Sequence, residues 1–211
     1  MAMRAHIQSR LANAPRSGDP LARLQRDVVG PISPALLAVL KNKQSPAAVL
    51  LGLIERPAGL ALLLTERSPD LKDHPGQVSF PGGRIESSDD GPVGAAIREA
   101  GEEVGLKRSL ITVAGCLDDQ LIVTGFVVTP VVAFVSSRYR PVADGREVAE
   151  VFEVPLEFLL DERNIRTGYR ERLGTRIRMH EVDYGGHRIW GATASILVQF
   201  LSVISNEQTE A

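Results

Sequence analysis

Cysteine is nearly absent from this chain, since Cys116 is the single one among 211 residues. One cysteine excludes an internal disulfide framework and a zinc cluster built from cysteines. We expect Cys116 to be a small buried hydrophobic residue next to Leu117, and not a nucleophile.

The sequence also has no apolar run long enough to span a membrane and no signal peptide with a hydrophobic centre. Its formal net charge of −2 gives no overall attraction to nucleic acid or to a membrane surface. We therefore expect a cytoplasmic protein that binds neither of these, and the sequence leaves a homodimer open. With 44% hydrophobic residues, the chain can bury the core of an ordinary domain.

The N-terminal segment is basic, because it has no acid before Asp19. Its arginines are Arg4, Arg10, Arg16 and Arg23. Organelle transit peptides share this bias, but we expect an ordinary frayed basic terminus. No internal repeat or low-complexity linker divides the remainder of the chain. We therefore expect residues 1–30 to be an N-terminal extension and residues 31–211 to be a single domain.

Apolar runs of strand length alternate with turn residues through the chain. They cover residues 49–54, 60–65, 78–80, 111–117, 126–135, 150–154, 176–184 and 187–191. Residues 176–191 predict a hairpin, and Pro130 favours an edge strand or a bulge over a central strand. Helices are expected at 32–41, with Ser33 as N-cap, at 155–160 and at 193–204. This order indicates an α+β fold with a mixed sheet covered by helices on both faces.

A further helix is predicted from Pro92 to a stop at Gly105. Its apolar stripe consists of Val93, Ile97, Ala100 and Val104. Glu99, Glu102 and Glu103, at i, i+3 and i+4, project together from another side, where three like charges repel one another.

A solvated acidic face is the common explanation for such a stripe. Here Arg98 can reach Glu102, but Lys107 lies beyond the helix stop and cannot relieve Glu103. The preceding Gly82-Gly83 turn lets backbone carbonyls approach the same region. Carboxylates with a carbonyl make a hard-oxygen site of the kind that Mg²⁺ or Mn²⁺ occupies.

Gly83 together with Arg98-Glu99-Ala100-Gly101-Glu102-Glu103-Val104-Gly105-Leu106 resembles the Nudix box. That pattern runs Gly, five residues, Glu, seven residues, Arg-Glu, an apolar residue, any residue, Glu-Glu, any residue, Gly, apolar. Counting from Gly83, the first acidic position falls on Asp89 instead of Glu, and the run to Arg98 is one residue too long. The connector thus carries an insertion, which leaves the roles of Asp89 and Glu86 open.

The resemblance implies an α/β/α sandwich and a hydrolase that cleaves a diphosphate linked to another moiety. It implies metal ligation by Gly83, Glu99, Glu102 and Glu103, with catalytic roles for Glu102 and Glu103. Arg98 stays charged, so it cannot be a base, and we expect it to pair with a neighbouring carboxylate. The general base is left open among a box glutamate, Glu147 and Glu150, with Glu150 preferred because it starts a strand.

The segment before the box indicates which class of diphosphate substrate is expected. Leu63-Leu64-Thr65-Glu66-Arg67-Ser68, three residues, Lys72, three residues, Gly76, three residues, Phe80-Pro81-Gly82-Gly83 is similar to the signature of the coenzyme A pyrophosphatase branch. That signature has Arg in place of Lys72, so bidentate phosphate pairing is lost there. The resemblance implies substrate binding by Thr65, Arg67, Ser68, Lys72 and Gly82. It also implies hydrolysis of coenzyme A to 4′-phosphopantetheine and adenosine 3′,5′-bisphosphate.

Two other readings remain at this point. One is a Nudix hydrolase of another substrate, such as ADP-ribose, a dinucleoside polyphosphate or a nucleoside triphosphate. The other is a Nudix module that binds a nucleotide without hydrolysing it, although all three box glutamates are present. Late in the chain lies a basic segment, expected to be mainly a solvated loop, that would attract the 3′-phosphate of coenzyme A. Its arginines are Arg163, Arg166, Arg170, Arg172, Arg176 and Arg178.

Overall fold

The computed structural model describes residues 2–14, 16–41, 44–122 and 125–205. Its helices are α1 (Ala2–Asn13), α2 (Pro20–Gln25), α3 (Pro34–Lys41), α4 (Gly91–Val104), α5 (Leu156–Leu160) and α6 (Gly191–Ser205), with short 3₁₀ turns at Arg108–Leu110 and Glu162–Asn164. None of the helices in these ranges is long and apolar enough to cross a membrane.

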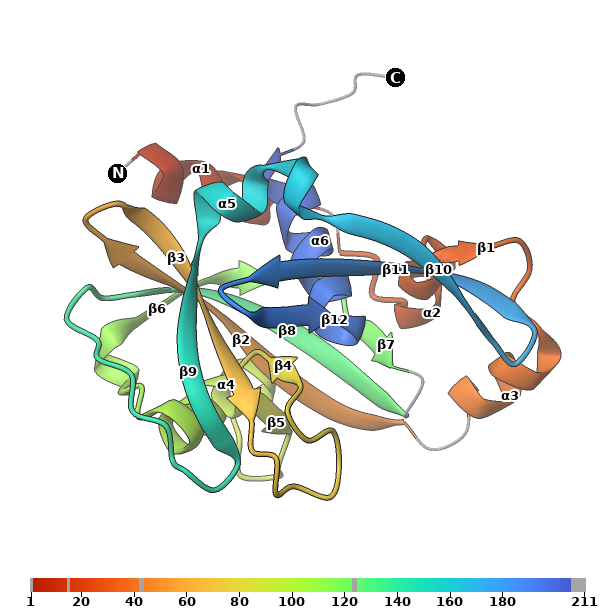
Figure 1. Ribbon diagram of the computed structural model, residues 1–211, viewed down its shortest axis with the longest axis horizontal. Coiled ribbons are helices and arrows are strands. Elements are labelled where there is room, and N and C mark those ends of the chain that lie inside the picture. Colours follow the sequence, from red (N-terminus) through yellow and green to blue (C-terminus); the bar gives the residue numbers. More distant parts are fainter. Residues whose placement is uncertain (1, 15, 42–43, 123–124, 206–211) are drawn as a thin grey trace.

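The larger of two sheets forms the centre of the molecule (Figure 1). Its path is β4 (Val78–Ser79), β3 (Gly59–Arg67), β2 (Ser45–Arg56), β8 (Phe126–Val135) and β6 (Ile111–Cys116). Three more strands pair beside this path: β5 (Gly82–Arg84) with β2, β7 (Gln120–Ile122) with β8, and β9 (Val148–Pro155) with β3. Because β2 and β8 run parallel while the other pairs are antiparallel, the sheet is mixed, as the sequence predicts.

The smaller sheet contains β1 (Val28–Val29), β10 (Arg166–Arg172), β11 (Thr175–Tyr184) and β12 (His187–Trp190). The predicted hairpin is confirmed, with Tyr184 opposite His187. The expectation of a solvated basic loop is wrong over residues 166–172, because these residues form β10 and pair along β11. All seven β10 residues are exposed, so no apolar alternation signals the strand.

The two faces of the central sheet bury separate clusters. On one face, Leu50 and Leu63 pack with Ala96 and Ala100 of α4. On the other face, neighbouring strand residues such as Leu51 pack with α6 and the helices near it; that cluster includes Ile7, Leu62, Leu64, Leu197 and Phe200. Consecutive strand residues point to opposite faces, so nearly continuous apolar strands are what a sheet covered on both sides needs. This α/β/α layering confirms the predicted fold class.

The N-terminus is not frayed, which corrects the expectation from sequence. Helix α1 lies beside α6 (Figure 1), and Ile7 is fully buried between the two helices and the sheet. Arg4 pairs with Glu55 of β2 at 2.9 Å, and Arg10 Nε donates to the Val203 carbonyl at 2.9 Å. Burial of Ile7 and Leu11, together with these polar contacts, holds a segment whose composition alone suggested a frayed terminus.

Pro130 lies in a central strand, which corrects the prediction of an edge. β8 pairs with β2 on one side and with β6 and β7 on the other. The Pro130 carbonyl accepts from Leu117 N at 3.0 Å, in the gap between β6 and β7. Because the N–H and C=O of one strand residue point to the same side, the N–H that proline lacks would point into this gap. No ladder hydrogen bond is lost there.

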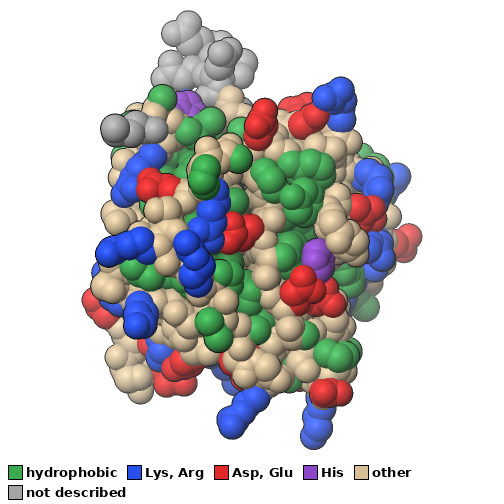
Figure 2. All heavy atoms as spheres, turned by 60° about the vertical axis from the view of Figure 1, so that its left-hand side comes forward, with side chains coloured by type: hydrophobic (Ala, Val, Ile, Leu, Met, Phe, Trp, Pro, Cys, Tyr) green, Lys and Arg blue, Asp and Glu red, His purple; other side chains and the backbone are tan. Residues whose placement is uncertain are grey.

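The surface carries charges of both signs. On the face shown in Figure 2, basic side chains (blue) and acidic side chains (red) are interspersed with hydrophobic ones (green). Neither sign covers that face, which agrees with a net charge of −2.

Candidate active site

The predicted box helix forms within one residue of its expected start. α4 has Asp90 at its N-cap, Pro92 within its first turn and Gly105 as a left-handed C-cap with φ of 66°. A left-handed residue ends a helix with little strain only when it lacks a Cβ. These local signals fix the helix, and the helix fixes which way each box glutamate points.

The Gly82-Gly83 turn, made by the bend at Pro81 and the start of β5, lies so close to β2 and α4 that only glycine fits. A Cβ added at Gly82 would lie 2.3 Å from the Ala48 carbonyl, and one at Gly83 would lie 2.4 Å from Glu99 Oε1. Gly82 N also donates to Glu103 Oε2 at 3.1 Å. The two carboxylates of Glu99 and Glu103 are therefore held against the backbone of this turn.

Glu103 is the buried member of the three box glutamates, with 7% of its surface exposed. Its pKa is raised to about 8, mainly by burial and to a lesser extent by the charges of Glu99 and Glu147, while the Gly82 N–H and Arg67 oppose the rise. The pKa of Glu99 is also raised, mainly by burial. Both residues therefore lie where a negative charge is disfavoured unless a cation is close.

Glu102 is the exposed member of the three box glutamates, and it lies on the same side of α4 as Glu99, because Arg98 Nη1 is 3.1 Å from a carboxylate oxygen of each. Its side chain is 60% exposed and accepts from Arg98 Nη1 at 3.1 Å. Burial separates Glu103 from Glu102 although the two are adjacent in sequence. Glu99 and Glu103 thus lie against the two glycines, and Glu102 lies at the exposed rim of the same group of carboxylates.

Arg98 makes the predicted pairing with a carboxylate. Its partner shows which acid of the connector, Asp89 or Glu86, contacts the box helix. Arg98 Nε donates to Asp89 Oδ1 at 2.9 Å and Nη2 donates to Asp89 Oδ2 at 3.0 Å. Glu86 contributes its backbone N–H, which donates to Asp89 Oδ2 at 2.8 Å. The bond to Arg98 lowers the pKa of Asp89. Asp89, and not Glu86, therefore takes the acidic position of the box despite the insertion.

The five residues expected to bind substrate differ in what they contact. Thr65 is buried and its hydroxyl bonds Ser79, with Oγ1 3.1 Å from the Ser79 carbonyl. Ser68 is also buried, and its backbone N–H donates to the Glu147 carbonyl at 2.8 Å. Lys72 is exposed. Gly82 lies in the turn against Glu103. Thr65 and Ser68 thus organise the strand end, and Lys72 lies free at the surface.

Arg67 is the expected substrate residue with unused donor capacity. Its Nε is buried and has no hydrogen-bond partner among the residues that the structure describes. Its positive charge lies close enough to Glu103 to oppose the rise of that pKa. A buried guanidinium N–H without a partner is costly, so its position beside the carboxylate pair favours an anionic ligand there.

The two candidate bases lie on different sides of the central sheet. Glu150 is paired across β3 and β9 with Glu66. In β9, Phe152 packs into the α6 cluster and Val151 into the α4 cluster, so Glu150, two residues from Phe152, points to the α6 side. The charge of Glu147, by contrast, raises the pKa values of Glu99 and Glu103.

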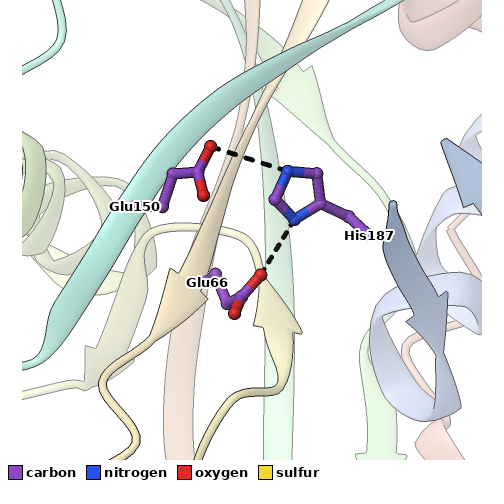
Figure 3. A group of neighbouring side chains, drawn as sticks. All are labelled: Glu66, Glu150 and His187. Atoms are coloured by element: carbon purple, nitrogen blue, oxygen red, sulfur yellow. Dashed lines mark hydrogen bonds and ion pairs between the residues drawn. The ribbon is translucent and has the colours of Figure 1, made fainter. Parts of the chain in front are cut away.

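Glu150 instead belongs to a cluster with Glu66 and His187 (Figure 3). His187 Nδ1 lies 2.8 Å from Glu66 Oε2, its Nε2 lies 3.6 Å from Glu150 Oε1, and its ring stacks on Phe152 at 3.8 Å. The three potential ligand atoms lie within 4.8 Å of one another, as they do in metal sites. Because the imidazole lies between the two carboxylates, each ring nitrogen already faces one of them (Figure 3). The cluster therefore joins β12 to the central sheet.

Asp144 is a residue of the site that the sequence reasoning missed. Its Oδ1 accepts from the backbone N–H groups of residues 146, 147 and 148, and its own N–H donates to the Glu103 carbonyl at 3.0 Å. Asp144 thus docks the Glu147 loop onto the end of α4. The Asp-Gly pair at 144–145, typical of a side-chain-capped turn, is the signal that could have found it.

The oxygens around the Gly82-Gly83 turn fit a hard divalent cation. The donor set comprises Glu99 and Glu103, whose pKa values are raised, the nearby carboxylate of Glu102 and the backbone at Gly83. Oxygen donors of this kind suit Mg²⁺ or Mn²⁺. A cation would stabilise the charged forms of these carboxylates, whose pKa values are raised mainly by burial. The arrangement is a candidate site for metal-assisted hydrolysis, and it lies beside Arg67, whose buried Nε has no partner in the described ranges.

Comparison with known proteins identifies the family. A family model described as the NUDIX domain matches residues 43–173. Nudix hydrolase 15, mitochondrial, of Arabidopsis thaliana is 39% identical over 168 residues, covering 76% of this chain and 59% of the relative. The uncharacterized Nudix hydrolase NudL of Pectobacterium atrosepticum is 40% identical over 179 residues, covering 83% of this chain and 90% of the relative. The chain belongs to the Nudix family and is a hydrolase of diphosphate bonds.

Among solved structures, a Nudix hydrolase from M. smegmatis, RenU, is similar with a TM-score of 0.47 and 30% identity. The match covers 56% of this chain and 74% of that one. The chain also spans only 59% of the length of the Arabidopsis relative. The family is therefore established by the domain match and by the NudL relatives, while the substrate needs an argument from the site.

Proposed function

We propose that this protein hydrolyses the diphosphate bond of coenzyme A or its derivatives to 4′-phosphopantetheine and adenosine 3′,5′-bisphosphate. The observation that carries the proposal is the segment from Leu63 to Gly83, which is similar to the coenzyme A pyrophosphatase signature and ends at the turn against Glu99 and Glu103. Within this segment, Arg67 has a buried donor without a partner among the described residues.

Glu99 and Glu103 are proposed to hold Mg²⁺ or Mn²⁺, with the Gly83 backbone and the rim residue Glu102 completing the ligand set. When bound, the cation neutralises the diphosphate and acidifies water. Arg98 fixes the helix against the connector through Asp89 and supports Glu102. These contacts support a role for Arg98 in positioning the carboxylates that are proposed to bind the metal.

Glu147 is proposed as the general base in place of Glu150. Its charge acts on Glu99 and Glu103, and its loop is tied to α4 by Asp144 and to β3 by Ser68. A base must come within hydrogen-bond reach of the proton that it removes. Glu150 faces the α6 side of the sheet, where His187 lies 3.6 Å away.

Arg67 is proposed to bind the diphosphate, because it lies on the Glu103 side of the sheet. The 3′-phosphate is assigned to the basic hairpin of β10 and β11. Among its arginines, Arg166 pairs with Glu181. The other four arginines of the hairpin, Arg170, Arg172, Arg176 and Arg178, have no carboxylate partner within the described residues. Unpaired arginines raise the local concentration of a polyanionic substrate.

A substrate panel with product analysis tests the proposal. Coenzyme A, dephospho-coenzyme A, ADP-ribose and a diadenosine polyphosphate are compared with Mg²⁺ and with Mn²⁺. We expect the highest kcat/KM for coenzyme A, with both named products, and a lower value for dephospho-coenzyme A that approaches the first in high salt.

Three other outcomes of the substrate panel would each contradict part of the proposal. A preference for ADP-ribose or the dinucleotide would keep the family and reject the coenzyme A assignment. Equal efficiency on coenzyme A and dephospho-coenzyme A at low salt would reject recognition of the 3′-phosphate. Binding without hydrolysis of any of the four would indicate a nucleotide-binding module.

A further inference from the structure

A surface pocket of about 350 Å³ lies away from the diphosphate site. It is formed by the end of α1, the segment after α2, the end of β6 and α6, and it contains no residue of α4, of the glycine turn or of the Glu147 loop. Small-molecule sites commonly have volumes of this order. None of its residues takes part in the chemistry proposed above.

The pocket is basic, because Arg10, Arg16 and Arg26 line it against one acid, Asp118. Asp118 is buried and its Oδ1 already accepts from Ser17 N at 2.7 Å. Arg16 has only a long contact of 3.4 Å to Asp119, and Arg26 has no ion pair within the described ranges. The uncompensated charge is therefore positive, in a protein with a net charge of −2.

Gln199 gives the pocket a buried acceptor. Only 7% of its surface is exposed, and its Nε2 donates to the Asp118 carbonyl at 3.1 Å. Because that carbonyl can only accept, the amide orientation is fixed and Oε1 is the remaining polar atom. Oε1 is buried and has no hydrogen-bond partner among the residues described. A buried acceptor of this kind calls for a donor from a ligand or from water.

We propose that this pocket is a second binding site, specific for a small phosphorylated molecule that also carries a hydroxyl or amine donor. The arginines meet the phosphate, and Gln199 Oε1 accepts from the donor group. Neither part alone satisfies the pocket, since an anion leaves Gln199 unpartnered and a neutral donor leaves the arginines uncompensated.

Cys116 supplies a readout confined to this pocket. It lines the pocket, is half-buried, and is the only cysteine of the chain. The rate at which iodoacetamide alkylates Cys116, followed by intact mass, therefore reports occupancy of this pocket and not of the diphosphate site. The full chain is used with EDTA and at constant ionic strength, so that phosphate does not bind through a divalent cation.

Three probes separate the two parts of the site: glycerol 3-phosphate, inorganic phosphate and glycerol. We expect glycerol 3-phosphate to slow alkylation saturably, inorganic phosphate to protect at concentrations about tenfold higher, and glycerol to have no effect. Equal protection by the two phosphates would overturn the donor specificity, and no protection by glycerol 3-phosphate at millimolar concentration would overturn the site.

Variants locate the anion contact. The double change Arg16→Gln and Arg26→Gln alters two exposed side chains, and we expect it to weaken protection by at least about tenfold. Protection is measured relative to each protein's own ligand-free alkylation rate, which should be lower in this variant because Arg16 lowers the pKa of Cys116. Arg108→Gln with Arg138→Gln removes the same charge from exposed positions outside the pocket and serves as the matched control. Equal loss of protection in both proteins, or none in either, would overturn the assignment of the arginines.

Discussion

Gly83 lacks a side chain at the place where the carboxylate of Glu99 lies, since a Cβ there would be 2.4 Å from Glu99 Oε1. The same turn donates its Gly82 N–H to Glu103. These two glycines therefore set the positions of the buried Glu103 and the half-buried Glu99, and the spacing of glycine to helix in the sequence has a steric cause.

Gly83→Ala should consequently displace Glu99 and damage the metal site. We expect kcat/KM to fall by about 100-fold, because a misplacement of about 1 Å can cost that much. Isothermal titration of Mg²⁺ should show weaker binding in parallel. Gly101→Ala is the control, since a Cβ at Gly101 meets nothing closer than 3.7 Å, and alanine favours a helix. Wild-type activity and Mg²⁺ affinity in Gly83→Ala would contradict the assignment.

Glu103 should make the metal-free protein less stable as pH rises. Its pKa is about 8 when folded against an ordinary 4.5. Between these values the folded state binds the proton and the unfolded state does not, so the free energy of unfolding falls with rising pH. Glu103→Gln removes this term, so in EDTA its Tm should exceed that of wild type by more at pH 8.5 than at pH 5. About 2 to 4 °C corresponds to each kcal/mol for a chain of this size.

Glu102→Gln is the comparison for that experiment, because its side chain is 60% exposed. We expect only a small change in Tm that does not grow with pH. Mg²⁺ should restore part of the stability of wild type at pH 8.5 and have less effect on Glu103→Gln. A pH-independent Tm difference between Glu103→Gln and wild type would show that Glu103 carries no raised pKa.

Local signals explain what the sequence predicted well. Pro92 and Gly105 bound the box helix, and the paired glycines 185 and 186 form the turn between β11 and β12. The burial of Glu103 beside the exposed Glu102 could not be read from helical spacing, because it depends on where the Gly82 turn meets the helix. Pro130 failed as an edge signal for a similar reason, since the missing N–H is tolerated only because β6 ends and β7 begins opposite it.

The choice between Glu147 and Glu150 shows the same limit. Alternation along a strand tells that Glu150 and Phe152 share a face, but not which face the box helix covers. Only the packing of Val151 into the α4 cluster decides this. The loop that carries Glu147 is positioned by Asp144, whose bond to the Glu103 carbonyl spans 41 residues of sequence, from 103 to 144.

Glu147→Gln should therefore lower kcat by about 100- to 10,000-fold, with little change in KM, as expected for a proton transfer made in the transition state. Glu150→Gln should retain most of the kcat, since its side chain lies beside His187 on the opposite face of the sheet from α4. Steady-state kinetics with the best substrate of the panel distinguish them. If Glu150→Gln alone loses kcat, Glu150 is the base, and if neither does, the base lies within α4.

Arg67 gives the last prediction, because its buried Nε has no partner among the described residues and its charge acts on Glu103. This position places the guanidinium near Glu103, one of the carboxylates proposed to bind the metal, and therefore where the proposed function puts the diphosphate of the substrate. Arg67→Ala should lower kcat/KM by about 10- to 100-fold, the effect of losing a charged hydrogen bond. Arg67→Lys keeps the charge without the planar fork, so its kcat/KM should lie between those of wild type and Arg67→Ala. The loss should be equal for coenzyme A and dephospho-coenzyme A, which leaves their ratio unchanged. A ratio that falls towards one in Arg67→Ala would show that Arg67 reads the 3′-phosphate instead, and would move the diphosphate contact to another residue.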